Sequence, residues 1–351
     1  MSDIRPAQPS GHVNNFDGLR LAASLMVLFS HQFVLLGMHE SILGLPMTLG
    51  NVAVAMFFVM SGYLVTESWY NDPHIMRFAM RRFLRIWPGL VVAAVVIAVA
   101  GAVVTSIPLH EYFDRGVRRF VMFNAQLRPI YGLPGVFETT PANPNLSAVN
   151  GSWWTIPVEA RCYAYVAVLG AIGLRQRLLS LLALSAVALM YFKTLPGHAL
   201  DNGFDNLCYY YSVFFLTGVC ARQFDAEIRR YRLLLLGVGA ACLLLATLDQ
   251  YIRLAAWLVV APLTLWLGLR STPGLRAAAR FGDLSYGIYL YAFFVQQLSV
   301  RYWPATDSYV ATTAVATIVT ALLGWCSWHA AEAPALSLKR RLRQWFPDLA
   351  P

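Results

Sequence analysis

About ten apolar stretches follow one another through this 351-residue chain, and they constrain its fold more than any other feature. An α-helix needs roughly 20 mostly apolar residues to cross the hydrocarbon core of a bilayer. Hydrophobic residues make up 58% of the chain and charged residues only 13%, about half the charged share that is typical of soluble domains. Because a soluble protein of this composition would expose large apolar patches, the sequence predicts an integral membrane protein.

The predicted fold is all-α, a polytopic bundle of about ten transmembrane helices. The predicted spans are residues 17–37, 50–68, 86–106, 153–172, 176–192, 206–222, 231–248, 251–269, 281–300 and 309–330. They form one membrane domain over residues 16–335, with a short cytoplasmic segment at 1–15 and a basic cytoplasmic tail at 336–351. The connection 107–150 is long and rich in Pro, Asn and Gly, and a loop of that length is usually functional.

The distribution of basic residues predicts how the chain is oriented. An even number of spans places both termini on one side, and most of the 27 Lys and Arg residues fall in the loops of that side. The positive-inside rule therefore places both termini in the cytoplasm and the 107–150 loop outside, although that loop also contains arginines. The same distribution explains the net charge of +9 without nucleic acid as a partner.

Arg20 and His31 are ionisable side chains of the first span, where charge is costly and usually functional. Arg20 and His31 are eleven residues apart, which is about three helical turns, so they project from one face with ~16 Å between them. Arg20 alone also fits an interfacial anchor, and His31 alone fits a structural histidine between helices. Their shared face, with Asp17 one turn from Arg20, favours a functional interpretation.

A carboxylate enters the membrane in the fourth predicted span. Glu159 lies roughly 9 Å from the outer end of that span, and His31 should reach a similar depth from the other side. A carboxylate that orients an imidazole and stabilises its cation is the arrangement that general-base catalysis needs. We therefore predict His31 and Glu159 as catalytic residues. The alternative is a structural ion pair of Glu159, although Arg161 points to a different helical face.

A cluster of arginines precedes the third span. Arg81 and Arg85 are four residues apart and share a face if the segment is helical, and Arg82 lies between them. Positive-inside charge is the simple explanation of this cluster. Guanidinium groups also bind phosphates in a forked geometry, so a donor that carries phosphates could bind at Arg81, Arg82, Arg85 and Arg20.

Further polar and aromatic residues complete the candidate site. Ser61 in the second span is typical of close helix packing, and Glu332 at the cytoplasmic edge is more often an interfacial charge. Trp153 and Trp154, at the outer start of the fourth span, are predicted to shape the approach of an acceptor, and Tyr286 opens the ninth span. The five cysteines contain no C-x-x-C pair, so we expect no metal site.

Taken in order, these elements resemble the acyltransferase-3 family of integral-membrane O-acyltransferases. The elements are FDGLR (16–20) with His31 following, FFVMSGYL (57–64), RRFLRIWP (81–88), WTIPVE (154–159), SYGIYL (285–290) and EAP (332–334). The resemblance covers residues 16 to about 343. In one departure, many members carry a histidine soon after the fifth element, where this chain has Tyr291 and Ala292.

The resemblance implies transfer of an acyl group, usually acetyl, from cytoplasmic acyl-coenzyme A (acyl-CoA) to a hydroxyl of a cell-envelope or secreted glycan. It implies that His31 is the essential histidine and that Arg20 is its partner in an arginine–histidine motif. The expected partners are acyl-CoA such as acetyl-CoA, a carbohydrate acceptor and the lipid bilayer, and the expected location is the bacterial cytoplasmic (inner) membrane. The oligomeric state, a homo-oligomer included, stays open.

A membrane transporter or flippase for an anionic or glycan substrate is the competing interpretation, because charged residues in spans also line transport paths. Transporters are often built from inverted repeats, and none is evident in this sequence. A structural or signalling membrane protein is a third interpretation, but it leaves the six polar elements unexplained.

Overall fold

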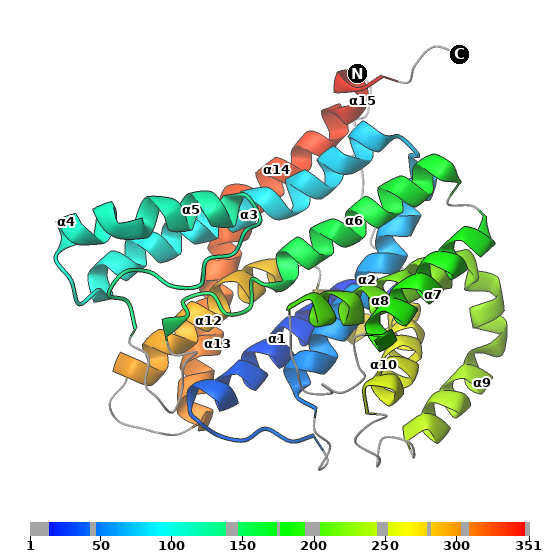
Figure 1. Ribbon diagram of the computed structural model, residues 1–351, viewed down its shortest axis with the longest axis horizontal. Helices are drawn as coiled ribbons and strands as arrows, with labels where there is room; N and C mark the ends of the chain where they lie inside the picture. Colours follow the sequence, from blue (N-terminus) through cyan, green and yellow to red (C-terminus); the bar gives the residue numbers. More distant parts are fainter. Residues whose placement is uncertain are drawn as a thin grey trace, which may run out of the picture.

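The computed structural model is a bundle of long α-helices (Figure 1). It describes residues 14–42, 47–137, 147–173, 176–193, 204–243, 252–278, 282–302 and 309–347. Within these ranges the chain contains no β-strand, so the predicted all-α class is confirmed.

Each predicted span overlaps a helix. These helices are α1 (Phe16–Leu35), α2 (Leu49–Asn71), α3 (Ile75–Val104), α6 (Thr155–Ile172), α7 (Arg177–Lys193), α8 (Phe204–Gln223), α9 (Asp225–Leu243), α10 (Ile252–Gly268), α12 (Leu284–Tyr302) and α13 (Tyr309–Ser327). Their bounds differ from the predicted ones, most of all for α3, which begins before residue 86. Residues 244–248, 251 and 281 of the predicted spans lie outside the described residues. Among the described residues, five helices are long and apolar enough to cross a membrane, namely α1, α2, α3, α6 and the continuous helix Tyr309–Trp345. The number of crossings and the orientation of the termini stay predictions.

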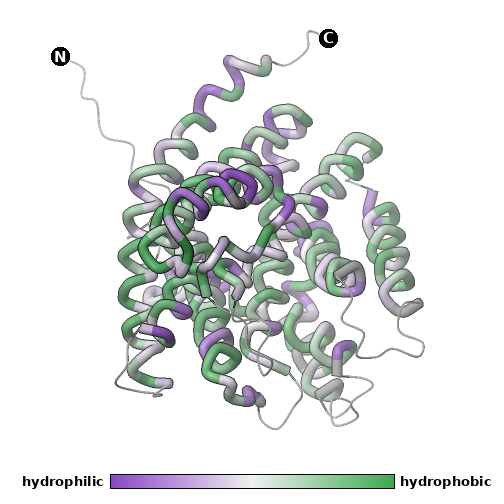
Figure 2. The backbone as a smooth tube through the Cα atoms, turned by 60° about the vertical axis from the view of Figure 1, so that its left-hand side comes forward, coloured by the Kyte–Doolittle hydropathy of each residue, from purple (hydrophilic) through white to green (hydrophobic). Residues whose placement is uncertain are grey.

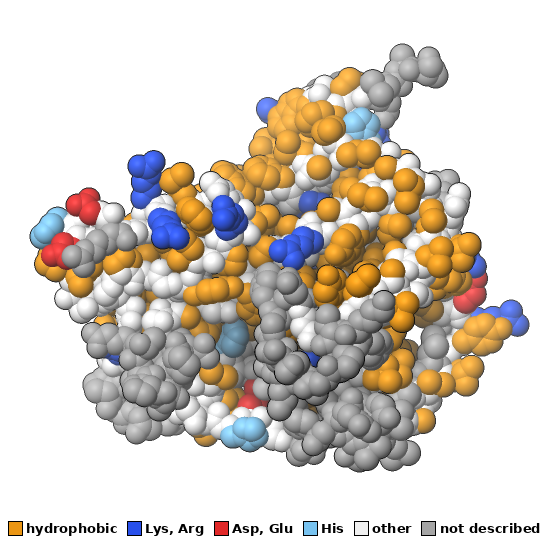
Figure 3. All heavy atoms as spheres, viewed as in Figure 1, with side chains coloured by type: hydrophobic (Ala, Val, Ile, Leu, Met, Phe, Trp, Pro, Cys, Tyr) orange, Lys and Arg blue, Asp and Glu red, His pale blue; other side chains and the backbone are white. Residues whose placement is uncertain are grey.

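Apolar side chains cover the outside of the bundle as well as its interior. Hydrophobic residues run along the long helices in Figure 2, and they cover much of the face shown in Figure 3. Val103, Val310 and Leu233 are exposed at 85%, 74% and 74%, respectively. Such a surface would be unstable in water, and it fits a protein whose helices face lipid.

Helices α2 and α8 cross in close contact at two glycines. A Cβ on Gly62 would lie 2.0 Å from the Phe215 carbonyl oxygen, and a Cβ on Gly218 would lie 2.2 Å from the Val59 carbonyl oxygen. Small residues let membrane helices approach until their backbones touch. Gly62 and Gly218 are therefore the positions at which α2 and α8 pack most closely.

We expect Gly218→Ala to lower the melting temperature of the protein in detergent. The added methyl meets backbone, which cannot rotate away, and overpacking of this kind typically costs about 1–3 kcal/mol. Gly237→Ala in α9 is the matched control, because a Cβ there meets nothing within 4 Å. Equal melting temperatures for Gly218→Ala and the unmodified protein would contradict the close crossing of α2 and α8.

The predicted long loop 107–150 is helical in part. Helices α4 (Leu109–Tyr112) and α5 (Arg118–Ala125), joined by the π-helix η1 (Phe113–Val117), run back along α3 (Figure 1). Tyr112 and Phe120 are buried, and the Tyr112 hydroxyl donates a hydrogen bond to the Ala98 carbonyl. The long connection therefore contains helices over 109–125, because these aromatic side chains pack the segment onto α3. Residues 138–146 of the predicted loop lie outside the described residues.

Several connections that were predicted to lie on one side of the membrane contact one another. The Asn15 amide donates to the Thr272 hydroxyl at 3.1 Å, and Arg177 pairs with Glu227. The chain after α13 continues through the π-helix η6 (Trp328–Glu332), α14 (Ala333–Ser337), the 3-10 helix η7 (Leu338–Arg341) and α15 (Leu342–Trp345). Its end reaches α3, where Arg77 donates to the Phe346 carbonyl at 2.8 Å. The basic connections therefore gather at one end of the bundle.

Candidate active site

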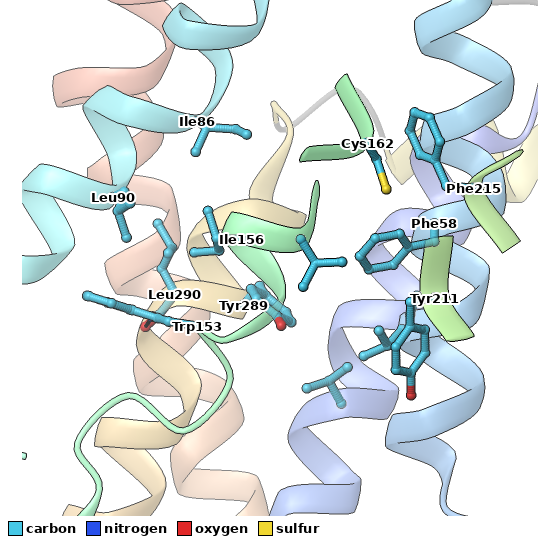
Figure 4. Close-up of a cluster of buried hydrophobic side chains, with 14 of the residues drawn as sticks. Phe58, Ile86, Leu90, Trp153, Ile156, Cys162, Tyr211, Phe215, Tyr289 and Leu290 are labelled. Atoms are coloured by element: carbon cyan, nitrogen blue, oxygen red, sulfur yellow. Dashed lines mark hydrogen bonds between the residues drawn. The ribbon is translucent and has the colours of Figure 1, made fainter. Parts of the chain in front are cut away.

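Helices α1, α2, α3, α6 and α12 enclose a cavity of about 60 Å³, which we call the central cavity. Its charged and polar lining includes Arg20, Ser61, Arg85, Glu159 and Tyr286. The other lining residues are Val54, Phe57, Phe58, Ile86, Thr155, Ile156, Tyr163, Ser285 and Tyr289. Figure 4 shows Phe58, Ile86, Ile156 and Tyr289 as they project from α2, α3, α6 and α12. Five of the predicted site residues thus meet in one place.

The two arginines of the cavity share a carboxylate that sequence reasoning missed. Asp283 Oδ2 lies 3.5 Å from Arg20 Nη1 and accepts a hydrogen bond from Arg85. Asp283 Oδ1 also accepts from the Ser285 backbone N–H at 3.3 Å, as the N-cap residue of a helix does. The Asp283-x-Ser285 pattern at the start of α12 is an ordinary helix-start signal, and nothing in it connects Asp283 with Arg20.

Glu159 is hydrogen-bonded to α2 and to its own helix. Its Oε1 atom accepts from the Ser61 hydroxyl at 3.0 Å and from the Tyr163 hydroxyl at 2.5 Å. The predicted pairing of Glu159 with His31 is therefore wrong. Arg161 lies 3.6 Å from the Cys208 sulfur, which agrees with its position on a different face of α6.

His31 lies beyond the central cavity instead of in its lining. Its ring packs edge-to-face on Phe293 of α12, with 5.2 Å between the ring centroids. Tyr289, which lines the cavity, precedes Phe293 by one helical turn of about 5.4 Å. His31 Nδ1 is buried without a hydrogen-bond partner among the described residues. A buried polar atom without a partner is costly, so this nitrogen is a candidate for binding or proton transfer.

Arg81 is paired with a protein carboxylate. It forms an ion pair with Asp72, which also accepts three hydrogen bonds from the Arg77 guanidinium. Partial burial acts to raise the pKa of Asp72, but the hydrogen bonds from Arg77 and Arg81 hold that pKa below its ordinary value. Arg81 therefore anchors the start of α3, and it shares the single negative charge of Asp72 with Arg77.

Arg82 is held differently from its neighbour. Its Nη2 atom donates to the Ser68 hydroxyl at 3.2 Å, and its guanidinium lies over the rings of Tyr163 and Phe78, at 5.6 and 5.8 Å from the centroids. In the part of the chain that the structure describes, Arg82 forms no ion pair with a carboxylate. Among the described residues its charge therefore has no carboxylate counter-ion.

Glu332 is buried next to Tyr286, which lines the central cavity. Only 2% of it is exposed, so its interpretation as an interfacial charge is wrong. Oε1 accepts from the Ser327 hydroxyl at 3.0 Å, whereas Oε2 has no hydrogen-bond partner among the described residues. A Cβ on Gly89 would lie 2.8 Å from the Tyr286 ring and 3.2 Å from Glu332 Cγ, so the glycine makes room for both side chains.

The two tryptophans support the bundle. Trp153 is 1% exposed and donates from its indole nitrogen to the Leu290 carbonyl at 3.0 Å (Figure 4). Trp154 packs on Tyr211, with ring centroids 5.5 Å apart. The prediction that Trp153 shapes the approach of an acceptor is therefore wrong, because the ring is sealed in the core. Asp17 lies in the first turn of α1, and the ion pair of Arg20 is with Asp283.

Metal ligands do not cluster in the described residues: no group of three or more His, Cys, Asp or Glu side chains there could hold a metal ion.

Comparisons with known proteins identify the family. A family model described as an acyltransferase domain matches residues 13–329. Nodulation protein 10 of Rhizobium leguminosarum bv. viciae is 28% identical over 375 aligned residues, which cover 95% of this chain and 96% of that protein. An O-acetyl transferase of Shigella phage Sf6 is 29% identical over 161 residues, covering 44% of this chain and 45% of the phage protein. No solved structure matches. The match covers most of the chain and includes α1, α2, α3, α6 and α12, which line the central cavity, so the chain belongs to the acyltransferase-3 family.

Proposed function

We propose that this membrane protein is an O-acyltransferase that moves an acyl group from cytoplasmic acyl-CoA to a hydroxyl of a cell-envelope or secreted glycan. The observation that carries the proposal is the meeting of Arg20, Arg85 and Glu159 in one cavity of an acyltransferase-3 bundle. Acetyl is the proposed acyl group, because one relative is named an O-acetyl transferase. The proposed location is the bacterial cytoplasmic membrane.

The donor enters from the end of the bundle where the basic connections gather. Its pantetheine arm extends through the central cavity, and the ~16 Å between Arg20 and His31 along α1 is about the length that such an arm spans. Glu159 is the carboxylate among the described lining residues, and it accepts hydrogen bonds. It is therefore suited to bind the amide N–H groups of the arm, in place of the orienting role first predicted for it.

His31 acts on the acceptor hydroxyl as a general base. It takes the hydroxyl proton while the oxygen attacks the thioester carbonyl carbon, the C–S bond breaks, and the leaving thiolate of CoA takes up a proton. The alternative is that His31 first accepts the acyl group itself and then passes it to the hydroxyl. Both routes consume one acyl-CoA for each ester formed, and neither needs a metal ion.

The test combines donor turnover with product analysis. Proteoliposomes that contain the purified protein are incubated with labelled acetyl-CoA and envelope glycans, and CoA release is followed together with the glycan masses. We expect glycan-dependent CoA release and an acetyl increment on the glycan. Movement of glycan or anion across the membrane without CoA release would favour a transporter and overturn the proposal.

A further inference from the structure

The helical segment after the matched domain folds back along α3. The family match ends at residue 329, yet the chain stays helical through Trp345 and lies beside α3 (Figure 1). Two contacts fix an antiparallel register. Glu332 lies against Gly89, and farther along, the Phe346 carbonyl accepts a hydrogen bond from Arg77.

Lys339 lies between these two contacts and faces the arginines of α3. Helix η7, which contains Lys339, packs against α3. The Lys339 ammonium group is therefore close enough to be repelled by the cations Arg82, Arg85, Arg81 and Arg20. The side chain is half-buried, and within the described ranges Lys339 has neither a carboxylate partner nor a hydrogen bond from its ammonium group. The C-terminal segment therefore adds the positive charge of Lys339 to the cluster of arginines on α1 and α3.

The cations of this cluster are not equally neutralised. Arg81 is paired with Asp72, while Arg20 and Arg85 share Asp283. Arg82 and Lys339 are left without a carboxylate, and the Arg82 Nε atom is buried without a hydrogen-bond partner among the described residues. Like charges that are partly shielded from water repel each other strongly, so an anion between them would stabilise the fold.

We propose that Arg82 and Lys339 together bind a phosphate of the acyl-CoA donor, so that the C-terminal segment completes the donor site. This inference rests on the proposed function, because it is the CoA donor that carries the phosphates. The guanidinium provides a planar fork and the ammonium a compact charge, both of which bind phosphate oxygens.

The position of the pair relative to the cavity supports this assignment. Arg82 lies over the ring of Tyr163, and Tyr163 also lines the central cavity. A phosphate at Arg82 and Lys339 would therefore sit beside the path of the acyl arm. Of the four arginines predicted as phosphate ligands, Arg20, Arg81 and Arg85 are paired with protein carboxylates. Arg82 is the one that remains available to bind a phosphate.

The test compares a donor that has phosphates with one that has none. CoA or pantetheine release by the purified full-length protein is measured with acetyl-CoA and with acetyl-pantetheine, using Lys339→Gln. We expect the variant to raise KM for acetyl-CoA about tenfold to a hundredfold, the range of a lost charge-assisted hydrogen bond, with little change in kcat. KM for acetyl-pantetheine should not change, and Lys339→Arg should restore most of the affinity for acetyl-CoA.

Arg340→Gln is the matched control, because it removes a neighbouring charge that is exposed. An unchanged KM of Lys339→Gln for acetyl-CoA would overturn the inference and leave acyl-CoA as the donor. Equal losses with both donors would also overturn it, because they would assign Lys339 a structural role. Absence of donor turnover by the unmodified protein would instead overturn the proposed function.

Discussion

His31→Ala is expected to abolish acyl transfer and leave the protein folded in the membrane. A general base contributes roughly 10²- to 10⁴-fold to a rate, so the residual activity should fall near the limit of detection. Nδ1 of His31 has no hydrogen-bond partner among the described residues, so no hydrogen bond of that nitrogen is lost with the ring. The contact with the Phe293 ring is lost, which predicts a small effect on stability. Acetylated glycan is measured by mass spectrometry at matched membrane levels of both proteins.

The control for this experiment is another histidine of the same chain. His329 is packed on the Trp325 ring with 4.4 Å between centroids, and it does not line the central cavity. His329→Ala should therefore keep the acyl increment. Full acetylation by His31→Ala would remove His31 from the chemistry, and equal loss in both variants would point to a general loss of folded protein.

The helices could be predicted from the sequence because lipid leaves few alternatives. A spanning segment must satisfy its backbone hydrogen bonds internally, so a long apolar run becomes a helix. The helices within 109–125 were not predicted, because this segment is short and lies between Pro- and Gly-rich stretches. Its helical form depends on packing against α3 through Tyr112 and Phe120, which a pattern within the segment does not encode.

The members of the site were easier to predict than their partners. Arg20, Ser61, Arg85, Glu159 and Tyr286 were all identified as polar or aromatic interruptions of apolar helices, and the central cavity contains them. Their contacts depend on how each helix is rotated about its axis. A helix that is apolar on every side gives no signal for that rotation. Equal depth in the membrane was therefore not enough to pair Glu159 with His31.

Asp283→Asn is expected to cause the largest loss of stability among the predicted variants of the site. The change leaves Arg20 and Arg85 without their shared carboxylate. Breaking one side of a buried ion pair costs about 3–5 kcal/mol, and the lower end applies here because these side chains keep some solvent contact. Asparagine is also a good N-cap, so the start of α12 should be preserved and the loss should report the charge alone. The measurement is the melting temperature in detergent.

A second substitution separates charge balance from other effects of Asp283. In the double variant Asp283→Asn with Arg20→Gln, one of the two unpaired cations is removed, so part of the lost melting temperature should return. Glu227→Gln provides the control, since Glu227 pairs with Arg177 where both side chains are more than 40% exposed, and exposed pairs contribute little. If the double variant is less stable than Asp283→Asn, Arg20 stabilises the bundle through contacts other than Asp283. If stability returns, Asp283 acts by neutralising the arginines, and the charge of the cavity is set by a residue at the start of α12.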